Sequence, residues 1–176
     1  MLKLFRKNPN AEAVYAVYNA IVAQSRQPVF YAQWGVPDTV TGRFDMISLH
    51  MALLFRRLRQ EKGRGPEFAQ QVFDLFFKDM DRSLREMGAG DLAVPKKIRN
   101  MGNIFFGLLV SLDKALDAGD PAGLEAVLRR NVYGDDSPGA VDRLAAYLEA
   151  QTAHLASHPA DAIIAGNLQL EAAPNE

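Results

Sequence analysis

The sequence offers few side chains that could bind a metal ion or take part in catalysis, and it has no cysteine. His154 and His158 are four residues apart, a spacing that places two imidazoles on one face of a helix, as in zinc sites. Residue 155 is leucine, however, where a zinc protease has a glutamate, and no thiolate is available as a third ligand. Two solvated histidines near a helix end are the simpler interpretation, so we expect no metal site.

His50 is the third histidine of the chain and lies five residues after Asp45, at the edge of a stripe of apolar side chains. A histidine satisfied by a hydrogen bond at a packing boundary is the preferred interpretation. The paired Glu-x-x-His elements of di-iron bundles, the G-x-S-x-G turn of hydrolases and the glycine-rich loops that bind phosphate are absent from the sequence. We therefore expect no cofactor and no catalysed reaction.

Charged residues are concentrated between positions 74 and 91. Side chains four residues apart are neighbours on a helix, so three ion pairs are predicted: Asp74 with Lys78, Asp81 with Arg85, and Arg82 with Glu86. Each such pair stabilises an exposed helix face by roughly 0.2–0.5 kcal/mol. Because a glycine turn follows at 88–90, the same residues could equally form an edge that recognises a partner.

Basic residues form a second concentration at the end of a predicted helix: Arg56, Arg57, Arg59, Lys62 and Arg64. The helix dipole favours cations at such an end, which makes a solvated helix end the first interpretation. Together with Lys96, Lys97 and Arg99 they could instead form one basic surface for RNA or lipid headgroups. The net charge of the whole chain is −1, so there is no general basic excess and we expect no DNA binding.

The length of 176 residues and the hydrophobic fraction of 48% are typical of one globular domain. The longest apolar run, residues 104–110, is too short for a membrane span, which takes about 20 residues. Met1–Lys7 alternates basic and apolar side chains but lacks the apolar stretch of a secretory signal. We expect a cytoplasmic protein and leave open a peripheral contact of Met1–Lys7 with the cytoplasmic face of the inner membrane.

Proline and glycine fall between segments with a hydrophobic period of 3.6 residues, and no segment alternates as a strand does. Residues 104–110 are apolar all round, which predicts burial, and residues 172–176 are expected to be frayed. The predicted fold is all-α, a single-domain bundle of six to seven helices. The predicted helices are 9–24, 44–62, 66–87, 94–116, 121–132 and 138–156, with one short turn in the ordered loop 28–42.

Several short blocks stand in a distinctive order along the chain. The first reads Phe-Tyr-Ala-Gln-Trp-Gly-Val-Pro-Asp-Thr from Phe30, followed by Gly-Arg-Phe-Asp from Gly42 and by His50. Later blocks are Phe77–Asp81, Leu84–Asp91, Val94–Lys97 and Phe105–Gly107. Together they resemble the ubiquinol–cytochrome c chaperone family over about residues 14–117, whereas the C-terminal helices expected within 121–165 match loosely. The chain begins close to the first block, which is typical of a bacterial member rather than an imported mitochondrial one.

The resemblance implies one helical chaperone domain over residues 1–176 that acts, without catalysis, in assembly of the cytochrome bc1 (ubiquinol–cytochrome c reductase) complex. The implied client is newly made cytochrome b, and the ribosome is an implied neighbour. The family supplies no catalytic or metal-binding residue. From the matching blocks we predict a client-binding surface that includes Trp34, Asp38, Arg43, His50, Asp79, Asp81, Arg85, Glu86 and Asp91.

A chaperone for an apolar client needs an exposed apolar groove with a charged border, and the helix predicted at 66–87 is a candidate wall. Two alternatives stay open. One is a small helical enzyme or carrier with a deep pocket for an isoprenoid or a porphyrin, in which Asp79, Asp81 and Arg85 are the polar groups. The other is a ribosome-associated adaptor that binds through the basic helix end.

Overall fold

The structure is a computed structural model that describes residues 10–134 and 139–175, and every structural statement below refers to those residues. They form helices and no strand, so the all-α prediction is confirmed. Six helices have eight residues or more and two have five. In chain order the elements are α1 (Ala11–Ser25), α2 (Pro28–Ala32), α3 (Val40–Leu58), α4 (Arg64–Glu86), α5 (Val94–Ala118), α6 (Pro121–Leu128), a π-helical turn (Arg129–Tyr133), α7 (Val141–Ser157) and α8 (Ala160–Ile164).

Helix ends follow the capping residues of the sequence. Thr39 caps α3, because its hydroxyl accepts a hydrogen bond from the backbone N–H of Gly42 at 3.1 Å. Asp120 caps α6 in the same way through the N–H of Gly123, at 2.9 Å, with Pro121 at the first helical position. Helix α3 begins four residues earlier than predicted, and the short turn expected in the loop 28–42 is α2.

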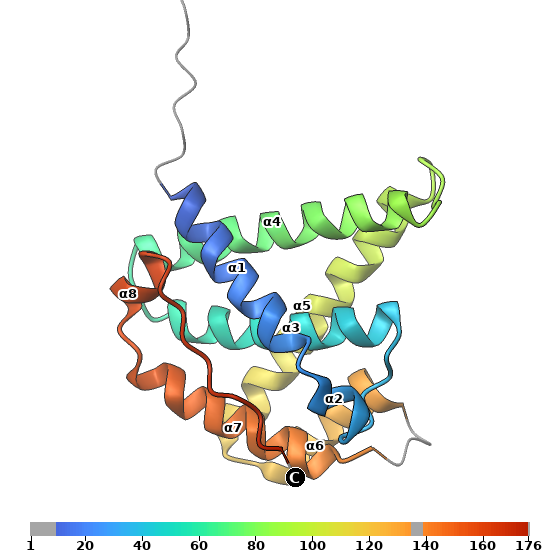
Figure 1. Cartoon of the computed structure of the whole chain (residues 1–176). Coiled ribbons are helices and arrows are strands. Elements are labelled where there is room, and N and C mark those ends of the chain that lie inside the picture. Colours follow the sequence, from blue (N-terminus) through green and yellow to red (C-terminus); the bar gives the residue numbers. More distant parts are fainter. Residues whose placement is uncertain (1–9, 135–138, 176) are drawn as a thin grey trace, which may run out of the picture.

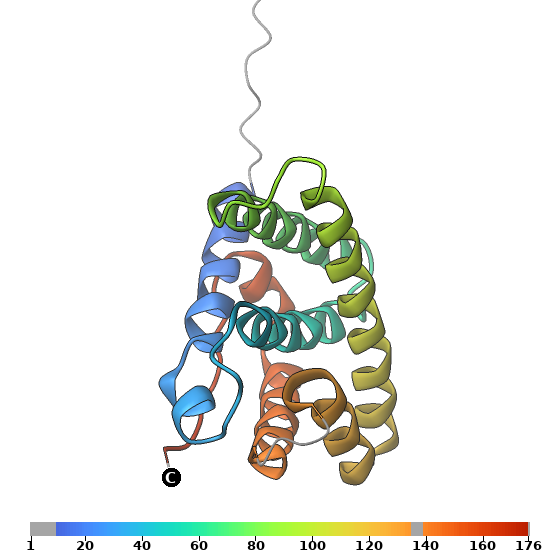
Figure 2. The ribbon, with the colours of Figure 1, turned by 90° about the vertical axis from the view of Figure 1, so that its right-hand side faces the viewer.

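Helix α3 lies at the centre of the bundle. It contacts α1, α4, α5 and α7, and most of its residues are buried. Figure 1 shows α4 above α3, α7 below it and α1 crossing in front, while α5 runs from the end of α4 down past α3. Figure 2, turned by 90°, shows α5 along one side of the molecule and α3 enclosed between the other helices. Because α3 is surrounded in this way, groups near its middle are shielded from solvent.

The run 104–110 of α5 is less buried than predicted. Phe105 and Leu108 are in the core, but Ile104, Phe106 and Val110 are 42%, 50% and 68% exposed. Only one face of this stretch packs on α3 and α4, and an apolar pattern all round the helix does not distinguish that face from the others. The expectation that the whole run is buried is therefore wrong.

The segment after α8 is held against the bundle by glutamine side chains. Gln151 donates to the carbonyl oxygen of Glu171 and accepts from its N–H, and Gln24 Nε2 donates to the same carbonyl at 2.6 Å. The N–H of Ala173 donates to Gln27 Oε1 at 3.1 Å, and Ala173 is buried. The prediction of a frayed end from residue 172 is therefore wrong as far as Ala173.

Some predictions fall on residues outside the described part of the chain. They are the lipid contact of Met1–Lys7, the helix start at Asn8–Pro9 and the start at Ser137–Pro138. Among the described residues, no helix combines the length and the apolar character that crossing a membrane requires.

Candidate functional site

A largely apolar groove lies where α3 begins, α4 ends and α5 begins. We call it the α3–α5 groove. It has a volume of about 570 Å³. Its lining residues are Val40, Thr41, Phe44, Asp45, Leu84, Met87, Gly88, Ala89, Lys97, Asn100, Met101 and Ile104. Helix α4, the predicted candidate wall, does form one side.

The first turn of α3 is fixed by a close backbone contact. A Cβ on Gly42 would lie 1.9 Å from the carbonyl oxygen of Pro37, so only glycine fits there without a shift of the backbone. This contact places the start of α3 against the preceding loop, with Thr41 at the groove and Phe44 and Asp45 as buried lining residues. The Phe44 ring stacks on Phe76 of α4, with centroids 5.6 Å apart, which joins this part of the groove to the core.

Asp45 is the unusual residue of the groove. It is 6% exposed, and the described residues give its carboxylate no hydrogen-bond or ion-pair partner. Burial raises the pKa of Asp45 to about 7, and no cation offsets that effect. Lys97 lines the same groove but is exposed, and its charge does not lower the pKa of Asp45. The groove therefore contains an acid that is costly to ionise.

The rim of the groove carries large apolar side chains in contact with water. Val40 lies at the start of α3, Met87 at the end of α4 and Ile104 in the first half of α5, and they are 55%, 54% and 42% exposed. Leu92 is 97% exposed in the short loop from α4 to α5, which also supplies Gly88 and Ala89 to the groove. Exposed apolar residues gathered in this way are typical of surfaces that bind another macromolecule.

The predicted charged residues of α4 form ion pairs close to the groove. Arg85 pairs with Asp81 at 2.6 Å and with Asp91 at 2.5 Å, which ties the end of α4 to the loop that follows. The Arg85 guanidinium lowers the pKa of Asp81. Asp81 precedes the lining residue Leu84 by three residues, so these two side chains are neighbours on α4 and the ion pair lies near that side of the groove. The exposure of these charges limits the stability they add to about 0–1 kcal/mol.

Asp79 and Glu86 both interact with Arg82, away from the groove. Arg82 contacts Asp79 and lies 3.8 Å from Glu86, and Tyr18 of α1 donates a hydrogen bond to Asp79 at 2.9 Å. Two of the three predicted ion pairs are thus present. The pairing of Asp74 with Lys78 is not, because Asp74 accepts a hydrogen bond from Gln70 instead.

Asp38 and Arg43 pair with each other at the other side of the α3 start. Their atoms are 2.8 Å apart and both side chains are more than half exposed. Hydrogen bonding from Arg43 lowers the pKa of Asp38. They line a separate shallow opening with Tyr31 rather than the α3–α5 groove.

Trp34 and His50, in contrast, are core residues, each only 1% exposed. Trp34 also borders a separate opening of about 370 Å³ with Tyr147 and Glu171. His50 Nδ1 faces the carbonyl oxygen of Met46 at 2.8 Å, so that nitrogen carries the proton, and Nε2 accepts from the Tyr147 hydroxyl at 2.8 Å. Burial lowers the pKa of His50 to about 4, so it is neutral near pH 7. The prediction of a hydrogen-bonded histidine is confirmed, but its position is the core rather than a boundary.

His154 and His158 fasten the C-terminal segment. His154 Nε2 lies 3.1 Å from the carbonyl oxygen of Gln169, and His158 Nε2 lies 2.8 Å from that of Asn167. Their rings stack with centroids 6.1 Å apart. The described residues contain no group of three or more potential ligands that could hold a metal ion.

The predicted joint basic surface is wrong, because its two halves lie at opposite ends of α4. The first half ends at Arg64, where α4 begins, and Lys96 follows its far end. At 1.5 Å per residue the helix separates them by roughly 33 Å. Within the first half, Arg56 and Arg59 also pair with Asp113 and Asp117 of α5.

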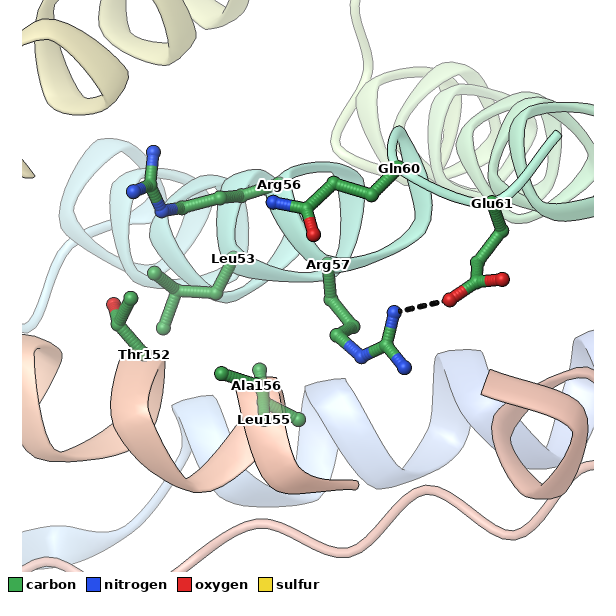
Figure 3. Close-up of a pocket in the computed structure, with 8 residues that line it drawn as sticks. All are labelled: Leu53, Arg56, Arg57, Gln60, Glu61, Thr152, Leu155 and Ala156. Carbon is green, nitrogen blue, oxygen red and sulfur yellow. Dashed lines mark hydrogen bonds and ion pairs between the residues drawn. The ribbon is translucent and has the colours of Figure 1, made fainter. Parts of the chain in front are cut away.

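A smaller opening near this basic end, of about 230 Å³, lies between α3 and α7 and is shown in Figure 3. Its cations already have partners. Arg57 pairs with Glu61 at 2.8 Å, the dashed line in Figure 3, and donates twice to the carbonyl oxygen of His158. Arg56 is engaged with α5. These contacts join α3 to α7 and α5 and explain the arginines as structural residues.

The deep pocket required by the enzyme alternative is not formed by its proposed polar groups. Asp81 and Arg85 are paired at the surface, and Asp79 lines a different, shallow opening with Tyr18 and Arg82. The sequence analysis did not select Asp45 as a site residue. Nothing in its local sequence indicates that its carboxylate lacks a partner, which depends on how three helices meet.

A helical bundle with an open apolar groove, rather than an enclosed polar pocket, is the kind of protein that binds another polypeptide. The chain belongs to the ubiquinol-cytochrome C chaperone family, whose model matches residues 32–170. A solved structure, of the Cbp3 homolog from Brucella abortus, is similar with a TM-score of 0.84 and 39% sequence identity, over 92% of this chain and 90% of that one. The ubiquinol-cytochrome-c reductase complex assembly factor 1 of Xenopus laevis is 23% identical over 145 residues, which are 81% of this chain and 72% of the relative.

The family match extends beyond the part of the sequence in which the resemblance is visible by inspection. The motifs cover about residues 14–117, whereas the family model reaches residue 170, at the end of the segment fastened by His154 and His158.

Proposed function

We propose that this protein is a non-enzymatic chaperone for assembly of the ubiquinol–cytochrome c reductase complex. The observation that carries the proposal is the family match over residues 32–170. The similarity to a relative named as an assembly factor of this complex, and to a solved Cbp3 homolog, supports it. The open groove supports a binding role, because its lining is largely apolar and is shared by three helices.

The proposed client is newly made cytochrome b, and the α3–α5 groove is its proposed binding surface. Exposed Val40, Met87 and Ile104 would lose contact with water when an apolar segment binds, at about 25 cal/mol per Å² of apolar area buried. The pairs formed by Asp81, Arg85 and Asp91 provide the charged border that keeps the free protein dispersed. The proposed place of action is the cytoplasmic face of the inner membrane, where a membrane subunit is inserted.

Of the predicted client-binding residues, Asp81, Arg85 and Asp91 are the ones closest to this surface by their place in the fold. Asp79, Glu86, Asp38 and Arg43 belong to neighbouring faces and are proposed as outer contacts for a longer client segment. Trp34 and His50 are buried core residues that do not line the α3–α5 groove, and Trp34 borders a different opening next to Tyr147.

Deletion of the gene tests the proposed function. Assembled bc1 complex, measured by native gel and by the reduced-minus-oxidised spectrum of b-type haem, should fall, while the transcripts of its subunits stay constant. The strain is then complemented with Ile104→Asn, in the groove, or with Val110→Asn, which changes another exposed apolar residue of α5 that does not line the groove. Val110→Asn should restore the complex and Ile104→Asn should not. A normal level of complex in the deletion strain contradicts the proposal.

A further inference from the structure

The α3–α5 groove combines an apolar rim with an acid that has nothing to pair with. Isolated ionised carboxylates are expensive to bury, so buried acids in proteins are normally paired or hydrogen-bonded. Asp45 is only 6% exposed, and its carboxylate has neither an ion-pair nor a hydrogen-bond partner among the described residues. Lys97, the cation among the lining residues, does not lower the pKa of Asp45. The free protein therefore lacks the positive charge that this site would accept.

An entirely apolar occupant gains nothing from this acid. It would displace the remaining water and leave Asp45 in its neutral, protonated form, with no charge to pair. An occupant with a positive charge at the right position gains instead, because the same shielding strengthens the ion pair. Charge complementarity thus selects a cationic group together with an apolar surface.

The shape of the groove favours a polypeptide as the carrier of that charge. The lining is shared by three helices, and the exposed rim residues Val40, Met87 and Ile104 come from all three. A helix laid into such a groove presents apolar side chains at three- and four-residue spacing to the rim and one side chain to the base. Lysine and arginine are long enough to place a cation at a recessed carboxylate while their methylene groups stay on apolar surface.

We propose that the α3–α5 groove binds an apolar helical segment of the client that carries one lysine or arginine, and that this cation pairs with Asp45. The inference rests on the proposed function for the identity of the client, but the pairing itself can be tested with the purified full chain. Asp45 would then be a specificity-determining residue, which explains why a costly acid is placed at the base of an apolar site.

The test compares two labelled helical peptides by fluorescence anisotropy. Both have leucine and alanine on one face and glutamine on the other, and they differ only in one central residue of the apolar face, lysine or glutamine. The wild-type chain should bind the lysine peptide about tenfold more tightly, which corresponds to about 1.4 kcal/mol. In Asp45→Asn the preference should fall below about twofold. Asp74→Asn, which alters an exposed acid of α4 that does not line the groove, should keep the full preference.

A second variant keeps the test valid if Asp45→Asn alters the fold. Ile104→Asn leaves Asp45 in place and should weaken both peptides alike, because it removes apolar contact without touching the carboxylate. The inference is overturned if the lysine peptide does not bind, if the two peptides bind equally, or if the lysine preference survives in Asp45→Asn. If one of these results is found and the deletion strain lacks the complex, the Asp45 pairing is wrong and the proposed function stands. If the deletion strain has a normal level of complex and the lysine preference is present, the pairing stands and the proposed function is wrong.

Discussion

Replacing Asp45 with asparagine should stabilise the protein, and the gain should grow with pH. The carboxyl has its ordinary pKa of 3.8 in the unfolded chain and a pKa of about 7 in the folded state. Below pH 3.8 both states are protonated, so the acid costs nothing. Between pH 3.8 and 7 the unfolded state releases its proton first, and stability is lost as the pH rises. Above pH 7 the loss is complete, and asparagine avoids it at every pH.

The size of the effect follows from the two pKa values. A difference of one pKa unit corresponds to 1.36 kcal/mol, so the full cost above pH 7 is about 4 kcal/mol. At pH 5 about 2 kcal/mol of that cost is already present, because only the unfolded state is largely ionised. The advantage of Asp45→Asn over wild type should therefore increase by about 2–3 kcal/mol between pH 5 and pH 8.

Urea denaturation monitored by far-ultraviolet circular dichroism at pH 5, 6, 7 and 8 gives the free energies of unfolding for both proteins. His50 and the other titrating groups are common to both, so their contributions cancel in the difference. Asp74→Asn serves as the control, since its carboxylate is exposed. A constant difference between Asp45→Asn and wild type from pH 5 to pH 8 would refute the description of Asp45 as a buried acid without a partner.

Two further predictions concern the parts of the fold around the groove. Gly42→Ala should lower the free energy of unfolding by about 2–4 kcal/mol, because its methyl group meets the Pro37 carbonyl at 1.9 Å, whereas Gly107→Ala, with open space around the new Cβ, should be neutral or stabilising. Thermal melts distinguish the two, and equal melting temperatures would contradict the close contact. The contribution of His50 to stability should fall by up to about 3 kcal/mol as the pH falls from 6.5 towards 4, since the unfolded state takes up a proton that buried His50 does not. Asp45 changes stability in the opposite direction in both proteins, so the effect is measured as the difference between wild type and His50→Gln, and a difference that stays constant from pH 6.5 to pH 4 would contradict it.

The helices themselves could be predicted because their information is local. Apolar residues at three- and four-residue spacing, together with proline and glycine between the segments, predicted α3, α4 and α5 to within a few residues. The capping position of Asp120 was predictable for the same reason, since a cap depends on a side chain and an N–H three residues away.

The groove could not be predicted, because it depends on which helix ends meet. Ile104 and Val110 lie in one apolar run, yet Ile104 lines the groove whereas Val110 is exposed outside it. Because the whole run is apolar, its periodicity does not distinguish the two positions. Asp45 and His50 are both polar residues on α3, but only His50 forms hydrogen bonds. One is donated to the Met46 carbonyl of the same helix, whereas its other partners, Ser25 and Tyr147, come from α1 and α7. Whether a buried polar group is satisfied is a property of tertiary packing.

The intrinsic fluorescence of Trp34 can be used to follow unfolding. Trp34 is the single tryptophan of the sequence, it is buried between Phe30 and Tyr147 with ring centroids 5.3 and 5.9 Å away, and its indole N–H has no hydrogen-bond partner among the described residues. An indole in such dry surroundings emits at short wavelength, and unfolding shifts the emission to the red. Trp34 does not line the α3–α5 groove, so its emission should report unfolding and should not change when a peptide binds. The anisotropy of the labelled peptide reports binding, so the two processes can be measured separately in the same sample.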